Sequence, residues 1–270
     1  MIAKADTTLA AVIRPAPNFE PRRGVEKPSI LLLHYTGVET AAKAIDWLTR
    51  VESRVSCHYA IDEAGCITQM VAEDMRAWHA GEAIWLGESD INSASIGIEI
   101  HNPGHELGYP DYPEAQLVAL EALCKDIIAR QGIRPEGVLG HSDVAPSRKK
   151  DPGEKFPWER LARAGIGHWV EPLPVMPAEA GFGIGVVGPL VADVQLLLRK
   201  YGYGIEATGV VDGKTEFVVT AFQRHFRPAR IDGRIDQSTI TTLERLLAAQ
   251  SKDTVVCPPL GVQPERPRRA

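Results

Sequence analysis

Short apolar runs that alternate with amphipathic stretches constrain the fold of this chain more than any other feature. One run, Ile30–Leu33, begins after Pro28 and is followed by a turn glycine, which is typical of a buried strand. A second run, Ser95–His101, is also strand-like. The stretches 41–48 and 115–130 carry apolar residues at helical spacing. We therefore expect an α/β fold with a mixed central β-sheet flanked by helices.

The length of the chain leaves room for a second unit. Its 270 residues, 44% of them hydrophobic, are enough for a core domain of about 150 residues and a smaller domain. Three prolines within residues 171–177 indicate a linker, and helical patterns bounded by glycines follow it. We expect an N-terminal arm at 1–26, a larger domain at 27–170, a proline-rich linker at 171–184, a small helical domain at 185–250 and a flexible tail at 251–270.

One loop, residues 141–153, concentrates a histidine, an arginine, two lysines and two aspartates between glycine and proline residues. This many polar groups is typical of an active site. Imidazole and carboxylate groups are good zinc ligands, and a catalytic zinc site has three protein ligands and one open position. His34, which follows the first apolar run, is the best candidate for a third ligand, because sites in mostly parallel sheets open at the ends of strands.

Glu99 lies between Ile98 and Ile100 in the second run, where acid or base catalysis is one reason for a carboxylate. Each of these features has a structural alternative. If the isoleucines face the core of an edge strand, Glu99 faces solvent. His34 could be a satisfied core histidine, and the 141–153 loop could be a solvated turn with locally paired charges.

Five pieces of sequence together resemble a known family, the zinc-dependent N-acetylmuramoyl-L-alanine amidases of the AmpD/AmiD type, also called amidase type 2. The pieces are Leu33–Gly37, Val55–Tyr59, Ala77–Gly81, Ser95–Glu99 and Gly140–Gly153. Their order and spacing cover about residues 17–160 and are more specific than any one piece. The resemblance implies that residues 27–170 form the catalytic domain, on a fold that peptidoglycan recognition proteins share.

The resemblance also implies roles for individual residues. His34, His141 and Asp151 are expected to bind one Zn²⁺ per chain. Glu99 is expected to activate the water, and Lys149 to face the developing oxyanion; only motif register places Lys149 ahead of Lys150. The expected substrate-binding residues are Asn102, Arg148, Trp78 and His79.

The substrate-binding residues have alternatives of their own. Asn102 precedes Pro103 and is equally typical of a turn. Arg148 could bind a stem-peptide carboxylate through its guanidinium group, but a loop arginine is often simply solvated. His79, within the Trp78–Gly81 segment, either lines the cleft or has a structural role.

Two positions differ from other branches of the superfamily. The branches that include phage lysozymes and recognition proteins usually have a cysteine as the third ligand and often a tyrosine on the strand before the His-aromatic pair. This chain has Asp151 and Cys57 at those places. The differences favour the branch with an aspartate ligand and a glutamate base.

Residues 185–250 resemble the three-helix type of peptidoglycan-binding domain, with Val211–Gly213 and Ile231–Gly233 as two related half-repeats. No catalytic constellation occurs in this region. We therefore expect a binding or positioning module. The alternative is a helical domain that only packs against the larger domain and braces it.

Together these features predict zinc-dependent hydrolysis of the amide bond between N-acetylmuramic acid, or its 1,6-anhydro form, and L-alanine in peptidoglycan fragments, in cell-wall turnover or recycling. The alternative is a non-catalytic muropeptide-binding protein on the same fold; an endopeptidase acting within the stem peptide would use the same chemistry. Expected partners are peptidoglycan fragments such as anhydro-muropeptides, and peptidoglycan itself. A net charge of −5 without a basic stripe argues against nucleic acid.

The compartment has a weaker signature. The apolar run Leu9–Ile13 is shorter than a secretory signal requires, and no apolar segment is long enough to span a membrane, so we expect no membrane partner. We expect a cytoplasmic protein, with the periplasm as the alternative if an export signal has been removed. The four cysteines are expected to be reduced thiols, with a Cys57–Cys66 bridge as the alternative.

Overall fold

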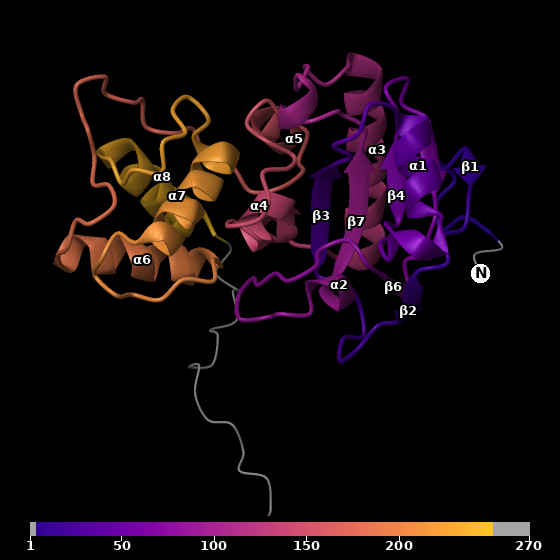
Figure 1. Cartoon of the computed structure of the whole chain (residues 1–270), viewed down its shortest axis with the longest axis horizontal. Helices are drawn as coiled ribbons and strands as arrows, with labels where there is room; N and C mark the ends of the chain where they lie inside the picture. The colour runs from indigo at the N-terminus through magenta and orange to yellow at the C-terminus, as the bar shows by residue number, and fades with distance from the viewer. Residues whose placement is uncertain (1–3, 251–270) are drawn as a thin grey trace, which may run out of the picture.

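The computed structural model describes residues 4–250, which form an α/β unit followed by a helical region (Figure 1). Six strands form one mixed sheet in the order β1-β5-β4-β7-β3-β8. Their bounds are β1 Val12–Ile13, β3 Ile30–Tyr35, β4 Tyr59–Ile61, β5 Ile67–Gln69, β7 Ser95–Ile100 and β8 Val138–Gly140. Two further strands, β2 Phe19–Pro21 and β6 Met75–Ala77, form an antiparallel pair. The tail expected at 251–270 lies outside the described residues.

The helices of the α/β unit confirm the predicted architecture. They are α1 Ala41–Leu48, α2 Ile91–Ala94, α3 Glu114–Gln131, α4 His141–Val144 and α5 Trp158–Arg163. Thr40 caps α1 by accepting the backbone N–H of Lys43, which supplies a partner to one of the free donors at a helix start. Helix α3 buries the apolar face that the sequence predicted: Leu117, Leu120, Leu123, Cys124 and Ile127.

Strands β3 and β7 lie side by side within the sheet and separate two layers of core. Leu31 and Leu33 belong to the same core as the apolar side chains of α3. Leu32 belongs to the opposite core, with residues of α2, α4 and the helical region. Because side chains alternate along a strand, His34 points to the side of Leu32. The parallel register of the two strands places His34 beside Glu99.

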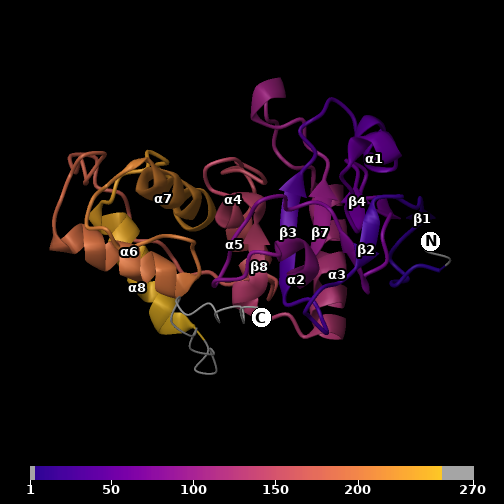
Figure 2. The same cartoon turned by 60° about the horizontal axis from the view of Figure 1, so that its bottom comes forward.

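Three helices, α6 Pro189–Tyr201, α7 Gly213–Phe226 and α8 Gln237–Ala249, make up the helical region. Both views place them next to α4 and α5, at the β8 side of the sheet (Figures 1 and 2). The segment expected to be a linker also has defined contacts. Leu173 donates its N–H to Thr242 Oγ1, and its carbonyl accepts from Ser238 Oγ, so this segment lies along α8. In residues 4–250 no helix is both long enough and apolar enough to span a membrane.

The helical region consists of two similar halves, in a register that the sequence did not reveal. In each half a glutamine accepts an N–H from a glycine in the following loop, and an aspartate then caps the next helix. These positions are Gln195, Gly209 and Asp212 in the first half and Gln223, Gly233 and Asp236 in the second. The predicted pairing of Val211–Gly213 with Ile231–Gly233 is therefore wrong. Hydrogen bonding, and not the Asp-Gly dipeptide, defines the repeat.

Candidate metal centre

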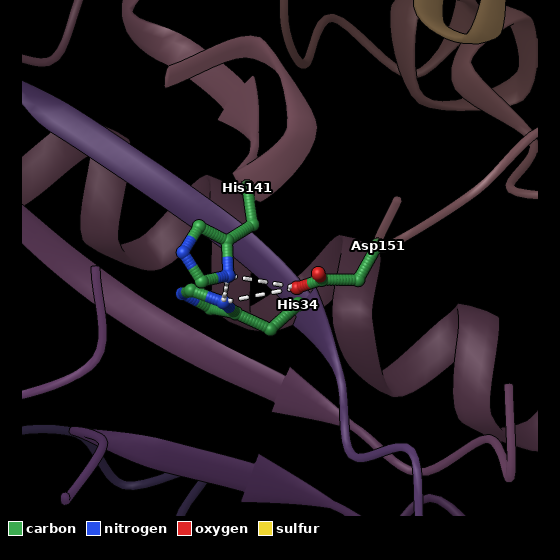
Figure 3. A group of neighbouring side chains, drawn as sticks. All are labelled: His34, His141 and Asp151. Atoms are coloured by element: carbon green, nitrogen blue, oxygen red, sulfur yellow. Dashed lines mark hydrogen bonds and ion pairs between the residues drawn. The ribbon is translucent and has the colours of Figure 1, made fainter. Parts of the chain in front are cut away.

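Three buried side chains meet at the carboxyl end of β3 (Figure 3). His34 belongs to β3, His141 begins α4, and Asp151 lies in the loop after α4. The Nδ1 atom of His34 is 2.9 Å from Nδ1 of His141 and 3.2 Å from Oδ2 of Asp151. His141 Nδ1 lies 3.0 Å from the same oxygen. The structure thus brings together the three residues that sequence analysis named as ligands.

A hydrogen bond determines which nitrogen of His141 faces the centre. Its Nε2 atom lies 2.9 Å from the carbonyl oxygen of Ala80. Because a carbonyl can only accept, Nε2 carries the proton. A neutral ring then presents the lone pair of Nδ1 to the centre, as a metal ligand must.

A relay of three groups orients His34 in the same way. Ser95 Oγ donates to the carbonyl of Ile91 at 2.6 Å, so it can accept from His79 Nε2 at 3.3 Å. The bare Nδ1 of His79 then accepts from His34 Nε2 at 3.0 Å. This leaves the lone pair of His34 on Nδ1, the atom that faces the centre.

Burial sets the charge states of these groups. Burial, and secondarily the adjacent His141, lowers the pKa of His34 to about 4. Burial also holds the pKa of His79 well below its usual range. For Asp151, burial raises the pKa, but the imidazoles of His141 and His34 outweigh that effect and the pKa falls below its usual range. At neutral pH the site therefore offers a neutral His34 and an ionised Asp151.

The donor set and its spacing fit a divalent metal ion. Ligand atoms about 2.0–2.2 Å from a tetrahedral zinc lie about 3.3–3.6 Å from one another. The three atoms here, two imidazole nitrogens and one carboxylate oxygen, lie 2.9–3.2 Å apart. Three protein ligands leave one position open, which is the arrangement of catalytic zinc sites.

Glu99 lies on the same face of the sheet as His34 and is largely enclosed. Strand β7 runs between β4 and β3, which rules out the edge-strand alternative. One carboxylate oxygen of Glu99, Oε2, is buried without a hydrogen-bond partner in the described part of the chain. Burial, together with the charge of Asp151, raises the pKa of Glu99 to about 8. A buried carboxyl group with a raised pKa beside a ligand cluster is typical of acid–base catalysis.

The two lysines of the loop have different surroundings. The positive charge of Lys149 lowers the pKa of both Glu99 and His34, so its ammonium group acts on the centre. Lys150 lies instead 3.7 Å from Glu106 Oε1 and is about half exposed. These surroundings separate two residues that the sequence distinguished only by motif register.

Asn102 has both ends of its side chain bound to the protein. Its amide donates to the Pro110 carbonyl at 2.8 Å, and its oxygen accepts the N–H of Gly104 at 2.9 Å. These bonds shape the loop after β7, as the turn alternative implied. Asn102 can bind substrate only in a way that keeps its hydrogen bonds to Pro110 and Gly104.

The other three residues expected at the substrate also have defined positions. Arg148 donates through Nη2 to the carbonyls of Ala80, at 3.1 Å, and of Glu82. Trp78 is half-buried directly after β6. His79 is buried behind His34, where it belongs to the relay.

Sequence reasoning missed the support behind His34. Ser95, Gly97 and Glu99 alternate along β7, so all three face the side of the centre. A Cβ atom at Gly97 would lie 2.6 Å from His79 Nδ1, so a side chain there would displace the imidazole. Small or polar residues at every second position of an apolar strand were the available signal.

The cysteines in the described part of the chain are free thiols. Cys57 and Cys124 are buried, and Cys66 is partly exposed. The alternative of a Cys57–Cys66 bridge is therefore wrong.

Two family models match the chain. The model described as N-acetylmuramoyl-L-alanine amidase matches residues 24–154, and the model described as a putative peptidoglycan binding domain matches residues 187–243. Among curated proteins, the chain is 36% identical to N-acetylmuramoyl-L-alanine amidase AmiD of Escherichia coli, across 83% of this chain and 84% of that protein. It is 33% identical to 1,6-anhydro-N-acetylmuramyl-L-alanine amidase AmpD of Salmonella typhimurium, across 54% of this chain and 86% of that protein.

Solved structures give the same relationship. A complex of the E. coli amidase AmiD with anhydro-N-acetylmuramic acid-L-Ala-D-gamma-Glu-L-Lys matches with a TM-score of 0.72 and 33% identity, covering 87% of this chain and 99% of that one. AmpDh3 of Pseudomonas aeruginosa in complex with an anhydromuramic pentapeptide matches with a TM-score of 0.70 and 34% identity, covering 82% and 91%.

Proposed function

The chain belongs to the N-acetylmuramoyl-L-alanine amidase family, and from that premise we propose that it hydrolyses the amide bond between N-acetylmuramic acid, or its 1,6-anhydro form, and L-alanine in peptidoglycan fragments. The observation that carries the proposal is the convergence of His34, His141 and Asp151 beside Glu99. The two related structures are complexes with anhydromuramic peptides, which supports fragments of this kind as the substrate class.

The metal in this proposal is one zinc ion held by His34, His141 and Asp151. Two imidazole nitrogens and a carboxylate oxygen are a donor set that zinc prefers. When bound, zinc lowers the pKa of water to about 7 and polarises a carbonyl group. The relay behind His34 and the Ala80 carbonyl behind His141 would hold both lone pairs toward it.

The protein groups then perform the proton transfers. Glu99, which the charge of a bound zinc ion would keep ionised, would accept a proton from the attacking water and deliver it to the leaving nitrogen of L-alanine. The bond between the lactyl carbonyl carbon and that nitrogen breaks, and the water oxygen stays on the new carboxylate. Lys149 would stabilise the negative charge that develops on the carbonyl oxygen, a contribution that is typically about 2.7–4 kcal/mol for one such donor.

The ends of the substrate would meet other residues of the same loops. Arg148 and Asn102 would contact the stem peptide or the sugar, with Trp78 and His79 at the wall of the cleft. The domain division of the sequence analysis belongs to the same proposal. The separate family matches at 24–154 and 187–243 support a catalytic domain at 27–170 and a peptidoglycan-binding-like domain at 185–250.

We also propose that the protein acts in the cytoplasm on recycled anhydro-muropeptides. The free thiols of Cys57, Cys66 and Cys124 fit a reducing compartment. Fractionation of the native organism tests this, and recovery of the protein with periplasmic markers would move its substrates to the cell wall.

Mass spectrometry of an anhydro-N-acetylmuramoyl tetrapeptide tests the reaction. The substrate is incubated with zinc-loaded protein, with chelated protein and with a zinc-loaded Glu99→Gln variant, which keeps the side-chain shape but cannot accept a proton. We expect free anhydro sugar and intact peptide from the first sample only, with a rate loss of at least about 10²-fold for the variant.

The other outcomes are equally informative. Measurable binding with intact substrate in all three samples would identify a muropeptide-binding protein. Shortened peptides that remain attached to the sugar would identify an endopeptidase.

A further inference from the structure

A buried carboxylate joins the helical region to the candidate metal centre. Asp143 lies on α4, two residues after His141, and is 1% exposed. Its Oδ1 atom accepts from the Tyr203 hydroxyl at 2.7 Å. Its Oδ2 atom lies 2.7 Å from Nδ1 of His225, on α7, and accepts the N–H of Gly140 at 2.8 Å. Two of its three partners therefore come from the helical region.

Both partners from the helical region are held in place. Because a carboxylate can only accept, Tyr203 donates its hydroxyl and His225 donates from Nδ1. The imidazole of His225 stacks on the indole of Trp158, with ring centroids 3.6 Å apart. Burial, with Asp143 nearby, raises the pKa of Tyr203 well above its usual range, so the phenol keeps its proton.

Helix α4 passes this constraint on to two of the candidate ligands. It is a single turn of four residues that begins with His141, so it has little rigidity of its own. The N–H of Ser142 donates to the Asp151 carbonyl at 2.9 Å, which ties the helix to the third ligand. Fixing Asp143 therefore fixes the backbone that carries His141 and the backbone that meets Asp151.

From this arrangement we propose that Tyr203 and His225 are positioning residues for the metal centre, which they hold in its binding geometry through Asp143. The proposal rests on the proposed function, because it assumes that His34, His141 and Asp151 bind the metal. It makes the helical region part of the catalytic apparatus, in addition to any contact that the region makes with peptidoglycan.

Packing between the two parts of the chain does not need this network. The indole of Trp85 already contacts Tyr201 and Tyr203 edge-on, and the Leu86 N–H donates to the Gly202 carbonyl at 2.8 Å. Desolvating a carboxylate is costly unless it is fully hydrogen-bonded. A buried carboxylate on α4, the helix that begins with His141, is therefore better suited to holding that helix in position than to joining the two parts of the chain.

Two neighbouring tyrosines provide a matched test. Tyr201 is also buried, and its hydroxyl bonds to His168 at 2.9 Å and not to Asp143. Tyr203→Phe and Tyr201→Phe each remove one buried hydroxyl from the same segment of the full-length protein. The zinc affinity of both variants and of the wild type is measured by equilibrium competition with a chromophoric chelator. We expect Tyr203→Phe to weaken zinc binding by about fivefold and Tyr201→Phe to leave it within about twofold.

A second pair of variants, at His225, tests the same network in case the tyrosine variants fail to fold. His225→Asn keeps an amide donor near the place of Nδ1, whereas His225→Leu removes it. Both variants lose the stacking on Trp158. We expect the asparagine variant to bind zinc within about threefold of wild type and the leucine variant about tenfold more weakly, at equal urea midpoints for the pair.

The outcomes distinguish the positioning role of the helical region from metal binding itself. Equal zinc affinities within each pair would show that the helical region only packs against the metal loop, and would overturn the inference. If the wild-type protein binds no zinc in the same assay, the proposed function itself fails.

Discussion

At the scale of single residues, the candidate site depends on where hydrogen atoms lie. In both His34 and His141 the Nε2 atom donates a hydrogen bond to an acceptor group, so Nδ1, the nitrogen that faces the centre, carries the lone pair. For His141 the acceptor is the backbone carbonyl of Ala80, and no side-chain substitution can turn that carbonyl into a donor. For His34 it is the imidazole of His79, which makes the relay sensitive to substitution.

Substitution of His79 should weaken metal binding without removing a ligand. His79→Leu leaves His34 Nε2 without an acceptor, so its ring can adopt the other tautomer. We expect about 10–100-fold weaker zinc affinity, the usual effect of losing such a partner. His79→Asn retains an oxygen acceptor near Nδ1 and should lose less than the leucine variant. Chelator competition measures both, and equal affinities for the two variants would contradict the relay.

At the scale of elements, equivalent positions in the two halves of the helical region have different energetic weight. Asp212 caps α7 and is exposed, with Thr215 as its partner. Asp236 caps α8, but it is 1% exposed and also pairs with the fully buried Arg227 at 3.1 Å. Removing a cap costs little, whereas leaving a buried guanidinium unpaired costs much more.

The two caps therefore predict different losses of stability. Asp212→Ala should lower the free energy of unfolding by about 0.5–2 kcal/mol, the range for a lost N-cap. Asp236→Ala should lower it by about 3–5 kcal/mol, because Arg227 loses its buried partner. Urea unfolding followed by circular dichroism measures both values. Equal losses would mean that Arg227 finds other acceptors at little cost.

At the scale of the whole molecule, the helical region and one face of the sheet share a single core. Side chains of β3, α2 and α4 belong to the same buried cluster as those of α6, α7 and α8. The proline-rich segment is bound to α8 through the backbone of Leu173, so it is not a free linker between two separate domains. Units that share a core in this way are expected to unfold together.

Metal removal should destabilise this whole unit at once. A ligand present at 100 times its Kd stabilises the folded state by about 2.7 kcal/mol. For a chain of this size we expect chelation to lower the Tm by about 5–10 °C in a single calorimetric transition. Two transitions, of which only one moves with zinc, would show that the helical region unfolds independently.

Much of the architecture follows from sequence patterns alone. The helical spacing at 41–48 and 115–130 and the apolar runs after Pro28 and at Ser95 correspond to α1, α3, β3 and β7. These elements depend on local periodicity, which is visible along the chain. The order of the motifs also predicted the family, and with it the three ligands and Glu99, which the structure places side by side.

Only the tertiary structure decided how these residues are supported. The contacts of His79 with His34 and of Asp143 with Tyr203 and His225 join positions 45, 60 and 82 residues apart. The register of the two helical halves likewise depends on hydrogen bonds between a helix and a later loop. Periodicity records which way a side chain faces, but not which distant group it meets, because that depends on how the layers pack.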